Sequence, residues 1–135
     1  MAKEFWLSLP VKNLNKSKEF FTKLGFMFNN GPGNSPTTAP LIIGNKSVVI
    51  MLCEEPTFHG YTGKEVTDTE KSNEVLLSFD ANSKEEVDEL VQKAIAAGGT
   101  SNHKATQMKG FMYGCVFSDL DGHRWNILHM DTSKM

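Results

Sequence analysis

The sequence has 135 residues, of which 39% are hydrophobic and 22% charged, and its formal net charge is −2. This length suits one globular domain, and the composition excludes disordered, collagen-like and disulfide-rich classes. Lysines are scattered among a slight excess of acids, so no basic stripe suggests nucleic-acid binding. No apolar run approaches the roughly 20 residues that span a bilayer, and no signal sequence is visible, so we expect a cytoplasmic protein that binds neither nucleic acid nor membrane.

Two isolated cysteines, Cys53 and Cys115, each lie within an apolar, strand-like run. Such cysteines are typical of buried free thiols in a reducing compartment. We therefore expect neither a disulfide nor a nucleophilic cysteine.

The first half of the chain is predicted to contain a strand, a helix, a further extended segment and a hairpin. The ranges are a strand over 5–11, a helix over 16–24, an extended segment over 26–29, a loop over 31–36, and a hairpin of strands 39–43 and 47–53. In the first strand Phe5, Leu7, Leu9 and Val11 share an apolar face, with Trp6, Ser8 and Pro10 opposite. In the helix, Phe20, Phe21 and Leu24 follow helical spacing, and Gly25 ends it.

The second half restarts the same order after residues 54–72, which lack periodicity and are expected to be a connection that can contain a helical turn. The expected elements are a strand over 74–79, a helix over 84–97, a short strand within 100–110, and a hairpin of strands 111–118 and 123–130 around the turn 119–122. Ser83 begins a capping box with Glu86. The predicted core stripe of the helix is Val87, Leu90, Val91, Ala94 and Ile95.

These halves form an internal repeat, because placing Glu74 on Trp6 also places Phe79 on Val11, at an offset of about 68. The prediction is an α+β fold in which paired β-α-β-β-β modules form a curved mixed sheet around a cleft. We expect a single domain over 1–135, with module 1 at about 1–55, a linker at about 56–72 and module 2 at about 73–135. Another α+β sandwich, such as a dimeric ferredoxin-like barrel, is the alternative, but three strands after each helix argue against it.

The cleft is the expected site of function. If the helices cover the more apolar side of each strand, the opposite side faces the cleft and collects polar groups among apolar ones, as small-molecule sites do. The residues predicted on that side are Trp6, Ser8, Val49, Met51, Glu74, Leu76, Ser78, Arg124, Asn126 and Leu128. The alternative is that Glu74 and Arg124 simply form an ion pair on a solvated sheet face.

Two stretches resemble the vicinal oxygen chelate superfamily of glyoxalases, bleomycin-resistance proteins and extradiol dioxygenases. Val11-Lys12-Asn13-Leu14-Asn15-Lys16-Ser17, followed by Phe20-Phe21 and Leu24-Gly25-Phe26, is similar to its opening V-x-D-L-x-x-S-x-x-F-Y-x-x-L-G-F. Asp119-Leu120-Asp121-Gly122-His123-Arg124-Trp125 is similar to its closing D-P-D-G-x-x-(W/I)-E, in which Asn126 replaces the glutamate. The resemblance spans nearly the whole chain.

In that superfamily, enzymes hold a divalent metal with His and Glu from four strands. The resemblance places those positions at Trp6, Met51, Glu74 and Asn126. Trp6 has no metal-binding atom and Met51 offers a soft thioether, so the family metal site looks degraded and we expect no cofactor. Nickel, zinc, manganese or iron held by Glu74 with the loop histidines His59 and His103 remains an alternative. His123 and His129 are about 20 Å apart along one strand and are expected to face away from the cleft.

The resemblance implies a protein that binds a small organic molecule without metal, either sequestering it or processing it. Trp6, Met51, Phe58 and Met112 are candidates for apolar contact and Arg124 for an anionic group, with Ser8, Leu76, Ser78 and Asn126 lining the same site. The alternative is a metal-dependent lyase, isomerase or dioxygenase in which Glu74 is the base or a ligand. A third hypothesis is a closed cleft and a role in subunit contact. The family resemblance implies a homodimer in each case.

Overall fold

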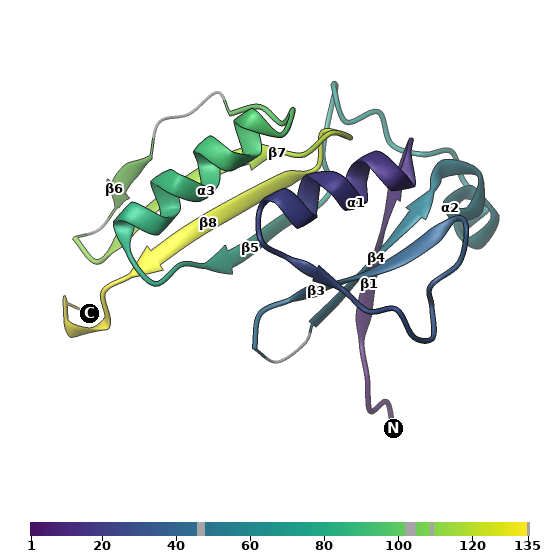
Figure 1. Cartoon of the computed structure of the whole chain (residues 1–135), viewed down its shortest axis with the longest axis horizontal. Helices are drawn as coiled ribbons and strands as arrows, with labels where there is room; N and C mark the ends of the chain where they lie inside the picture. Colours follow the sequence, from purple (N-terminus) through teal and green to yellow (C-terminus); the bar gives the residue numbers. More distant parts are fainter. Residues whose placement is uncertain (46–47, 102–104, 109, 135) are drawn as a thin grey trace. The chain divides into compact units, whose positions relative to one another are not determined.

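The computed structural model describes residues 1–45, 48–101, 105–108 and 110–134. In it the chain divides into two compact units, Met1–Asp68 and Thr69–Met135. Each unit contains one four-stranded mixed sheet and a long helix packed against that sheet (Figure 1). Within the described ranges, no helix is long and apolar enough to cross a membrane.

The first unit follows the predicted order of elements and adds a helix at its end. Its elements are β1 (Trp6–Val11), α1 (Leu14–Lys23), β2 (Met27–Phe28), β3 (Thr38–Ile43), β4 (Val48–Glu54) and α2 (Glu55–Thr62). The strand order in the sheet is β1-β4-β3-β2. β1 runs parallel to β4, whereas β3 is antiparallel to both β4 and β2.

The second unit repeats this arrangement. Its elements are β5 (Leu76–Asp80), α3 (Lys84–Ala96), β6 (Thr106–Met108), β7 (Met112–Ser118), β8 (Arg124–Met130) and a final 3-10 turn, η1 (Thr132–Lys134). The strand order is β5-β8-β7-β6, again with one parallel pair and two antiparallel pairs. The predicted α+β architecture of two β-α-β-β-β modules is confirmed.

Both long helices begin with a side-chain cap, although α1 begins at Leu14, two residues earlier than predicted. The Asn13 side chain accepts a hydrogen bond from the Lys16 N–H (3.1 Å), and the Ser83 hydroxyl accepts one from the Glu86 N–H (3.1 Å). Each side chain satisfies a donor that the first helical turn leaves unpaired. The Glu86 carboxylate bonds the Asn82 N–H (3.4 Å) rather than the Ser83 N–H, so the capping box is only partly formed.

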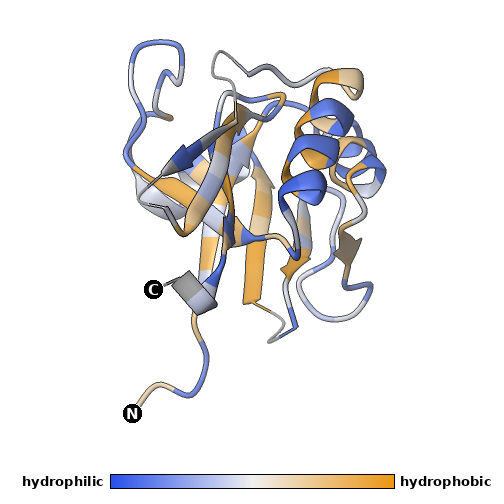
Figure 2. Ribbon diagram, turned by 90° about the vertical axis from the view of Figure 1, so that its left-hand side faces the viewer, coloured by the Kyte–Doolittle hydropathy of each residue, from blue (hydrophilic) through white to orange (hydrophobic). Residues whose placement is uncertain are grey.

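Each helix covers the apolar face of its own sheet, and two side-chain contacts identify that face. In the first unit the Glu54 carboxylate on β4 reaches the Leu14 N–H of α1 (3.3 Å). In the second unit the Tyr113 hydroxyl on β7 donates to Asp88 of α3 (2.7 Å). Leu52 on β4, and Cys115 and Phe117 on β7, share a face with these two residues and are buried. Figure 2 shows the hydrophobic colouring of the strands beside the hydrophilic outer sides of the helices.

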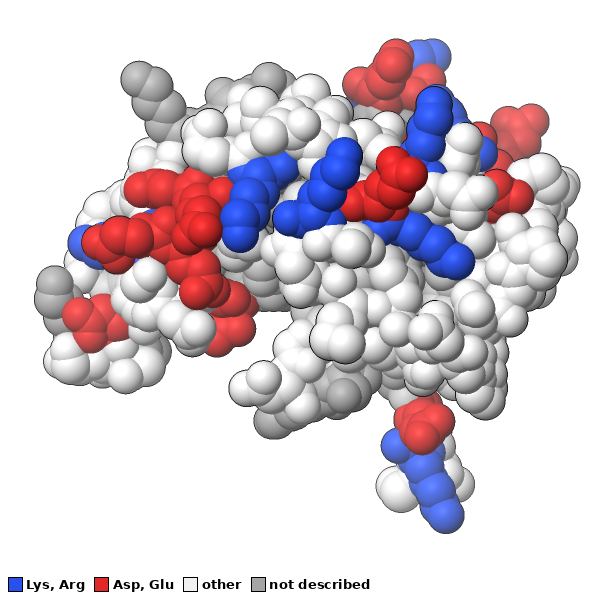
Figure 3. All heavy atoms as spheres, in the orientation of Figure 1, with Lys and Arg blue, Asp and Glu red and all other residues white. Residues whose placement is uncertain are grey.

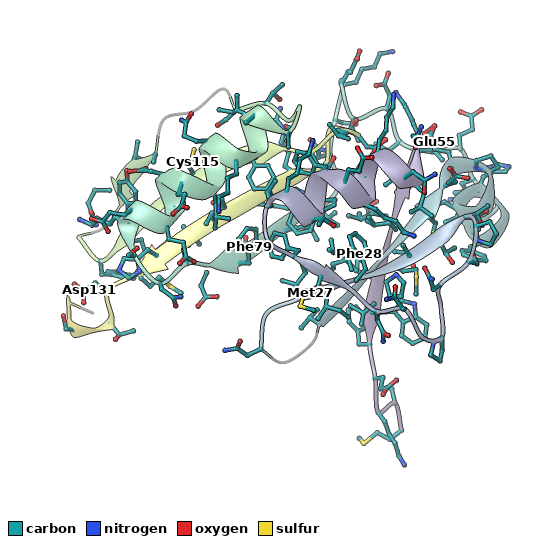
Figure 4. The ribbon with its side chains drawn as sticks, in the orientation of Figure 1. Met27, Phe28, Glu55, Phe79, Cys115 and Asp131 are labelled. Carbon is teal, nitrogen blue, oxygen red and sulfur yellow. The ribbon has the colours of Figure 1, made fainter. Side chains whose placement is uncertain are left out.

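The core on these faces is aromatic and aliphatic. Its fully buried side chains include Val11, Phe20, Phe21, Leu41 and Leu52 in the first unit and Val87, Phe117, Trp125 and Ile127 in the second. Phe79 and Cys115, labelled in Figure 4, belong to the same face of the second sheet, because both lie opposite Ile127 in the strand register.

Several predicted boundaries were wrong. Phe5 is 82% exposed and lies outside β1, so it contributes nothing to the core face. β5 begins at Leu76, so Glu74 and Val75 precede the strand instead of opening it. Residues 55–62 form a full helix, α2, where a connection was expected; Pro56 in its first turn and Gly63 with φ 73 at its end explain its limits.

The helix stripe also needs a correction, because Ile95 is exposed while Val87, Val91 and Ala94 are buried. Ile95 lies about 100° round the helix from the buried Ala94, at the edge of the stripe. Predictions that involve Lys46 in the first hairpin, and His103 in the 100–110 segment, fall outside the described residues.

Candidate functional site

We call the face of each sheet opposite its long helix the open face. On the first sheet, strand register places residues of the open face in three rows across the strands. The rows are Met27–Ile42–Val49–Trp6, then Pro40–Met51–Ser8, then Thr38–Cys53–Pro10. The predicted site residues Trp6, Ser8 and Met51 therefore do lie on one face, and Met27 and Phe28 project to opposite sides of β2 (Figure 4).

Exposure increases along this face from one end to the other. Cys53 is completely buried, Met51 and Ser8 are half-buried, and Trp6 and Met27 are 55% and 74% exposed. The first row consists of four apolar side chains, two of them largely in water, across all four strands. An exposed apolar row of this kind on one sheet face is typical of a binding surface.

The loop 31–36 covers part of the open face. A side-chain carbon at Gly33 would lie 2.9 Å from the Met51 methyl group, and Gly33 has a φ of 93 that favours glycine. The Thr38 hydroxyl holds this loop by donating to the Gly33 carbonyl (2.7 Å). Met51 is therefore packed under a backbone segment rather than pointing freely to a ligand.

Cys53 is a structural thiol. Burial raises the pKa of the Cys53 thiol, while a hydrogen bond with Ser8 acts in the opposite direction. A thiol that is completely buried and whose thiolate is disfavoured is not a nucleophile at neutral pH. Both cysteines are free and buried, as predicted.

On the second sheet the open face carries the polar candidates. Its rows are Ser118–Arg124–Leu76, then Val116–Asn126–Ser78, then Thr106–Gly114–Leu128–Asp80. The Asn126 amide donates to the Ser78 hydroxyl (3.3 Å), which joins β8 to β5 on this face. Arg124, Asn126, Ser78 and Leu76 are therefore neighbours, as the sequence predicts.

The turn before β8 fixes the chain on both sides of Arg124. The buried Asp119 carboxylate accepts the His123 backbone N–H (3.1 Å) through one oxygen and the Trp125 indole N–H (2.9 Å) through the other. Both neighbours of Arg124 are thus bonded to one carboxylate. Burial raises the pKa of Asp119, although the charge of His123 and the Trp125 hydrogen bond oppose the shift.

The segment before β5 supports the same turn from outside. The Thr69 hydroxyl donates to the Asp121 carbonyl (2.6 Å), and the Asn73 amide donates to the Gly122 carbonyl (3.2 Å). Gly122 has a φ of 80, and a side chain there would collide with Thr69. This close packing explains the glycine of the Asp-Leu-Asp-Gly motif.

Other predicted site residues do not join these groups. Glu74 is exposed in a bend two residues before β5, and among the described residues it makes no ion pair with Arg124. Met112 lies on the open face but pairs with Met130, six residues from Arg124 and so about 20 Å along β8. Phe58 is half-buried on α2, outside the sheet.

The histidines among the described residues, His59, His123 and His129, take part in local hydrogen bonds or packing. His129 faces α3, since it pairs with Tyr113, and its ring nitrogen bonds the Ala81 carbonyl (3.1 Å). His123 is buried in the turn beside Asp119, and the exposed His59 bonds the Lys64 carbonyl (2.7 Å). No group of three or more His, Cys, Asp or Glu side chains among the described residues is placed to hold a metal.

The four positions that correspond to the family's metal ligands do not fit a catalytic divalent metal. Trp6 has no atom that can coordinate a metal, and the Met51 thioether is packed beneath Gly33. Asn126 can offer one amide oxygen and Glu74 one carboxylate, whereas such sites generally need about three protein ligands of matching hardness.

Sequence reasoning missed Met27, Ile42 and Pro40 on the first open face and Ser118 on the second. Ile42 and Pro40 could have been found by pairing the strands of the first hairpin, since each lies opposite a predicted site residue of β4. Ser118 follows from alternation along β7. No local signal identifies Met27, because a two-residue strand has no periodicity of its own.

Comparisons with known proteins agree with this architecture. Residues 5–127 match the family model described as the Glyoxalase/Bleomycin resistance protein/Dioxygenase superfamily. A hypothetical protein from S. aureus is 36% identical, with a TM-score of 0.84 over 96% of this chain and 94% of its own. No protein with a curated description matches the sequence.

Two further solved structures share the fold at lower identity. A glyoxalase/bleomycin resistance protein/dioxygenase family enzyme from Burkholderia phytofirmans is 22% identical, with a TM-score of 0.78 over 93% of this chain and 97% of its own. A fosfomycin resistance protein from Listeria monocytogenes, complexed with Mn(II) and sulfate, is 18% identical, with a TM-score of 0.70 over 99% and 95%. From its family match, and from the repeat of two β-α-β-β-β modules, the chain belongs to the glyoxalase/bleomycin resistance protein/dioxygenase superfamily, also called the vicinal oxygen chelate superfamily.

Proposed function

We propose that this protein binds a small organic molecule through the exposed apolar row of its first sheet, and that it does so without a divalent metal. The observation that supports this proposal is the row Met27–Ile42–Val49–Trp6, which leaves a tryptophan more than half exposed on a sheet face. An aromatic ring held on a strand provides contact area at little conformational cost. Small-molecule sites are lined in this way.

The side chains at the four family positions support binding over metal-dependent chemistry. Neither Trp6 nor Met51 can supply a hard donor where the family's enzymes place one. Elemental analysis of protein purified with added nickel, zinc, manganese and iron(II) tests this part. We expect no stoichiometric metal in the wild type; bound metal that is lost in Glu74→Gln would favour a lyase, isomerase or dioxygenase instead.

Binding of Nile red, a neutral dye that fluoresces on leaving water, tests the apolar row. Trp6→Ala should weaken the dye's binding, because it removes the largest exposed side chain of the row. Phe5→Ala is the matched control, since Phe5 is also an exposed aromatic residue but lies outside β1. Equal dye binding by wild type and Trp6→Ala would contradict the proposal.

A homodimer is the assembly that we propose, since members of this superfamily often form one. Sedimentation velocity of the purified protein at several concentrations tests it. A single species of monomer mass at all concentrations would exclude it.

A further inference from the structure

We infer that the open face of the second sheet binds a small oxyanion, such as an organic carboxylate or phosphate, through Arg124. The inference goes beyond the proposed function, because it assigns a binding site of its own to the second unit. It depends on the position of Arg124, on the groups around it and on the turn that orients it.

Arg124 is the only arginine in the sequence; every other basic residue counted with it is a lysine. Arginine and lysine differ most where a planar group must donate two parallel hydrogen bonds to an oxyanion. Residues 69–135 contain ten acidic residues against seven Lys and Arg, and Figure 3 shows acidic side chains gathered over α3. The single arginine therefore lies in the acidic unit, on the face away from those acids.

Arg124 is half-buried and has no partner of opposite charge among the described residues. An ion pair in this unit joins Lys93 to Glu89 on α3 (3.3 Å), away from Arg124. On the open face the nearest acid in the sheet is Asp80, two rows away and therefore about 13 Å along the strands. A half-buried guanidinium without an internal counter-charge favours an anion from outside.

Three of the strand positions around Arg124 are polar. Ser118 and Leu76 are its direct neighbours on β7 and β5, and Ser78 and Asn126 form the next row, about 7 Å along the strand. The Ser78 hydroxyl accepts from the Asn126 amide, so its own proton is available to a ligand oxygen. Arginine and this hydroxyl can donate to the same anion.

The turn holds the backbone on both sides of Arg124 in place. Asp119 accepts hydrogen bonds from both residues that flank Arg124, and Thr69 and Asn73 bond the carbonyls of the turn. A side chain carried by a fixed backbone loses less conformational entropy on binding than one carried by a mobile loop.

The test is an NMR titration of the full-length ¹⁵N-labelled protein with benzoate, phenylphosphonate and neutral benzamide, three probes of similar size. The two anions should shift the Arg124 side-chain N–H signal and the Asn126 and Ser78 backbone signals in a saturable way. Benzamide should leave these signals in place. In Arg124→Gln the affinity for the anions should fall roughly tenfold or more, which is the scale of a lost charge-assisted hydrogen bond.

Three variants refine the result. Arg124→Lys keeps the charge but not the two-pronged geometry and should retain only part of the affinity. Lys93→Gln removes one positive charge from α3 and should bind the anions as the wild type does. Glu74→Gln removes the exposed carboxylate nearest to the start of β5 and should bind them slightly more tightly.

The outcomes separate this inference from the proposed function. Anion shifts at these signals no larger than those of benzamide, or anion binding that is unchanged in Arg124→Gln, would overturn the oxyanion site. Saturable shifts by all three probes at Trp6 and Val49 would still support the apolar row. A preference between the two anions would distinguish a carboxylate ligand from a phosphate ligand.

Discussion

Asp119 shows how one buried residue connects stability to the candidate site. Its carboxylate accepts the backbone N–H groups of Asp121 and His123 and the Trp125 indole N–H, and it is buried together with His123 and Trp125. The same hydrogen bonds that close the β7–β8 turn place Arg124 on the open face. A substitution at Asp119 is therefore expected to affect both folding and anion binding.

Replacing Asp119 with asparagine should destabilise the protein in a pH-dependent way. At pH 7 we expect a loss of roughly 1–3 kcal/mol in the free energy of unfolding. The reason is that the N–H₂ of the new asparagine would point at one of the N–H groups that the carboxylate accepts, so that one buried hydrogen bond is lost. Burial raises the pKa of Asp119 above its ordinary 3.8, so the folded state binds this proton more tightly than the unfolded state. The stability from this group is therefore greatest at low pH and declines as pH rises from about 4 through the folded pKa.

Urea unfolding at intervals between pH 7 and pH 4 provides the measurement. The stability difference between wild type and Asp119→Asn should widen as the pH falls. A difference that stays constant or narrows on acidification would show that burial does not dominate the pKa of this carboxyl group.

The two cysteines give a second prediction at this scale. Neither Cys53 nor Cys115 should react with a thiol reagent in the native protein, because both are buried and burial raises the pKa of Cys53. In concentrated guanidinium chloride both should react at once. Rapid modification of either thiol under native conditions would argue against the packing of its strand.

At the scale of single elements, the helix caps and the strand alternation were predictable, while strand limits and register were not. Asn13 and Ser83 cap helices as their sequence contexts indicate, because a cap depends on residues within one turn. Glu74 is spaced two residues from Leu76 and four from Ser78, as residues on one face of a strand are, yet β5 starts only at Leu76. Leu76 pairs with Arg124, which is the first residue of β8. β5 therefore cannot begin earlier, because β8 offers no residue to pair with Glu74.

Removal of either cap tests the helices directly. Asn13→Ala and Ser83→Ala should each lower the free energy of unfolding by about 1 kcal/mol, because each leaves a backbone N–H without its partner. Asn15→Ala is the control in α1, since Asn15 is exposed and alanine favours a helix. Urea denaturation curves measure all three; a loss for Asn15→Ala as large as that for Asn13→Ala would contradict the role of the cap.

At the scale of the whole molecule, the two units repeat one architecture, each around its own core. We propose that they nevertheless act as one domain over residues 1–135, with modules at about 1–55 and 73–135, because each alone is close to the size at which a core is marginal.

Unfolding cooperativity tests this proposal. We expect a single urea transition, and the cap variants Asn13→Ala and Ser83→Ala, one in each unit, should shift the same midpoint. Two transitions, each moved by only one of the variants, would show two independent domains.

The sequence by itself determined the fold class, the family and the face on which most candidate residues lie. These follow from local signals: alternation along strands, caps and glycines at helix ends, and the order of motifs along the chain. Trp6, Ser8 and Met51 were thereby placed on one face, and Arg124, Asn126 and Ser78 on another.

Only the tertiary structure decided how these residues are used. It places Gly33 over Met51, adds Met27 and Ile42 to the row of Trp6, separates Met112 from Arg124, and leaves Arg124 without an ion pair to Glu74. The reason is that loop paths and strand register depend on hydrogen bonds and packing between segments distant in sequence, whereas alternation depends only on the local geometry of a strand.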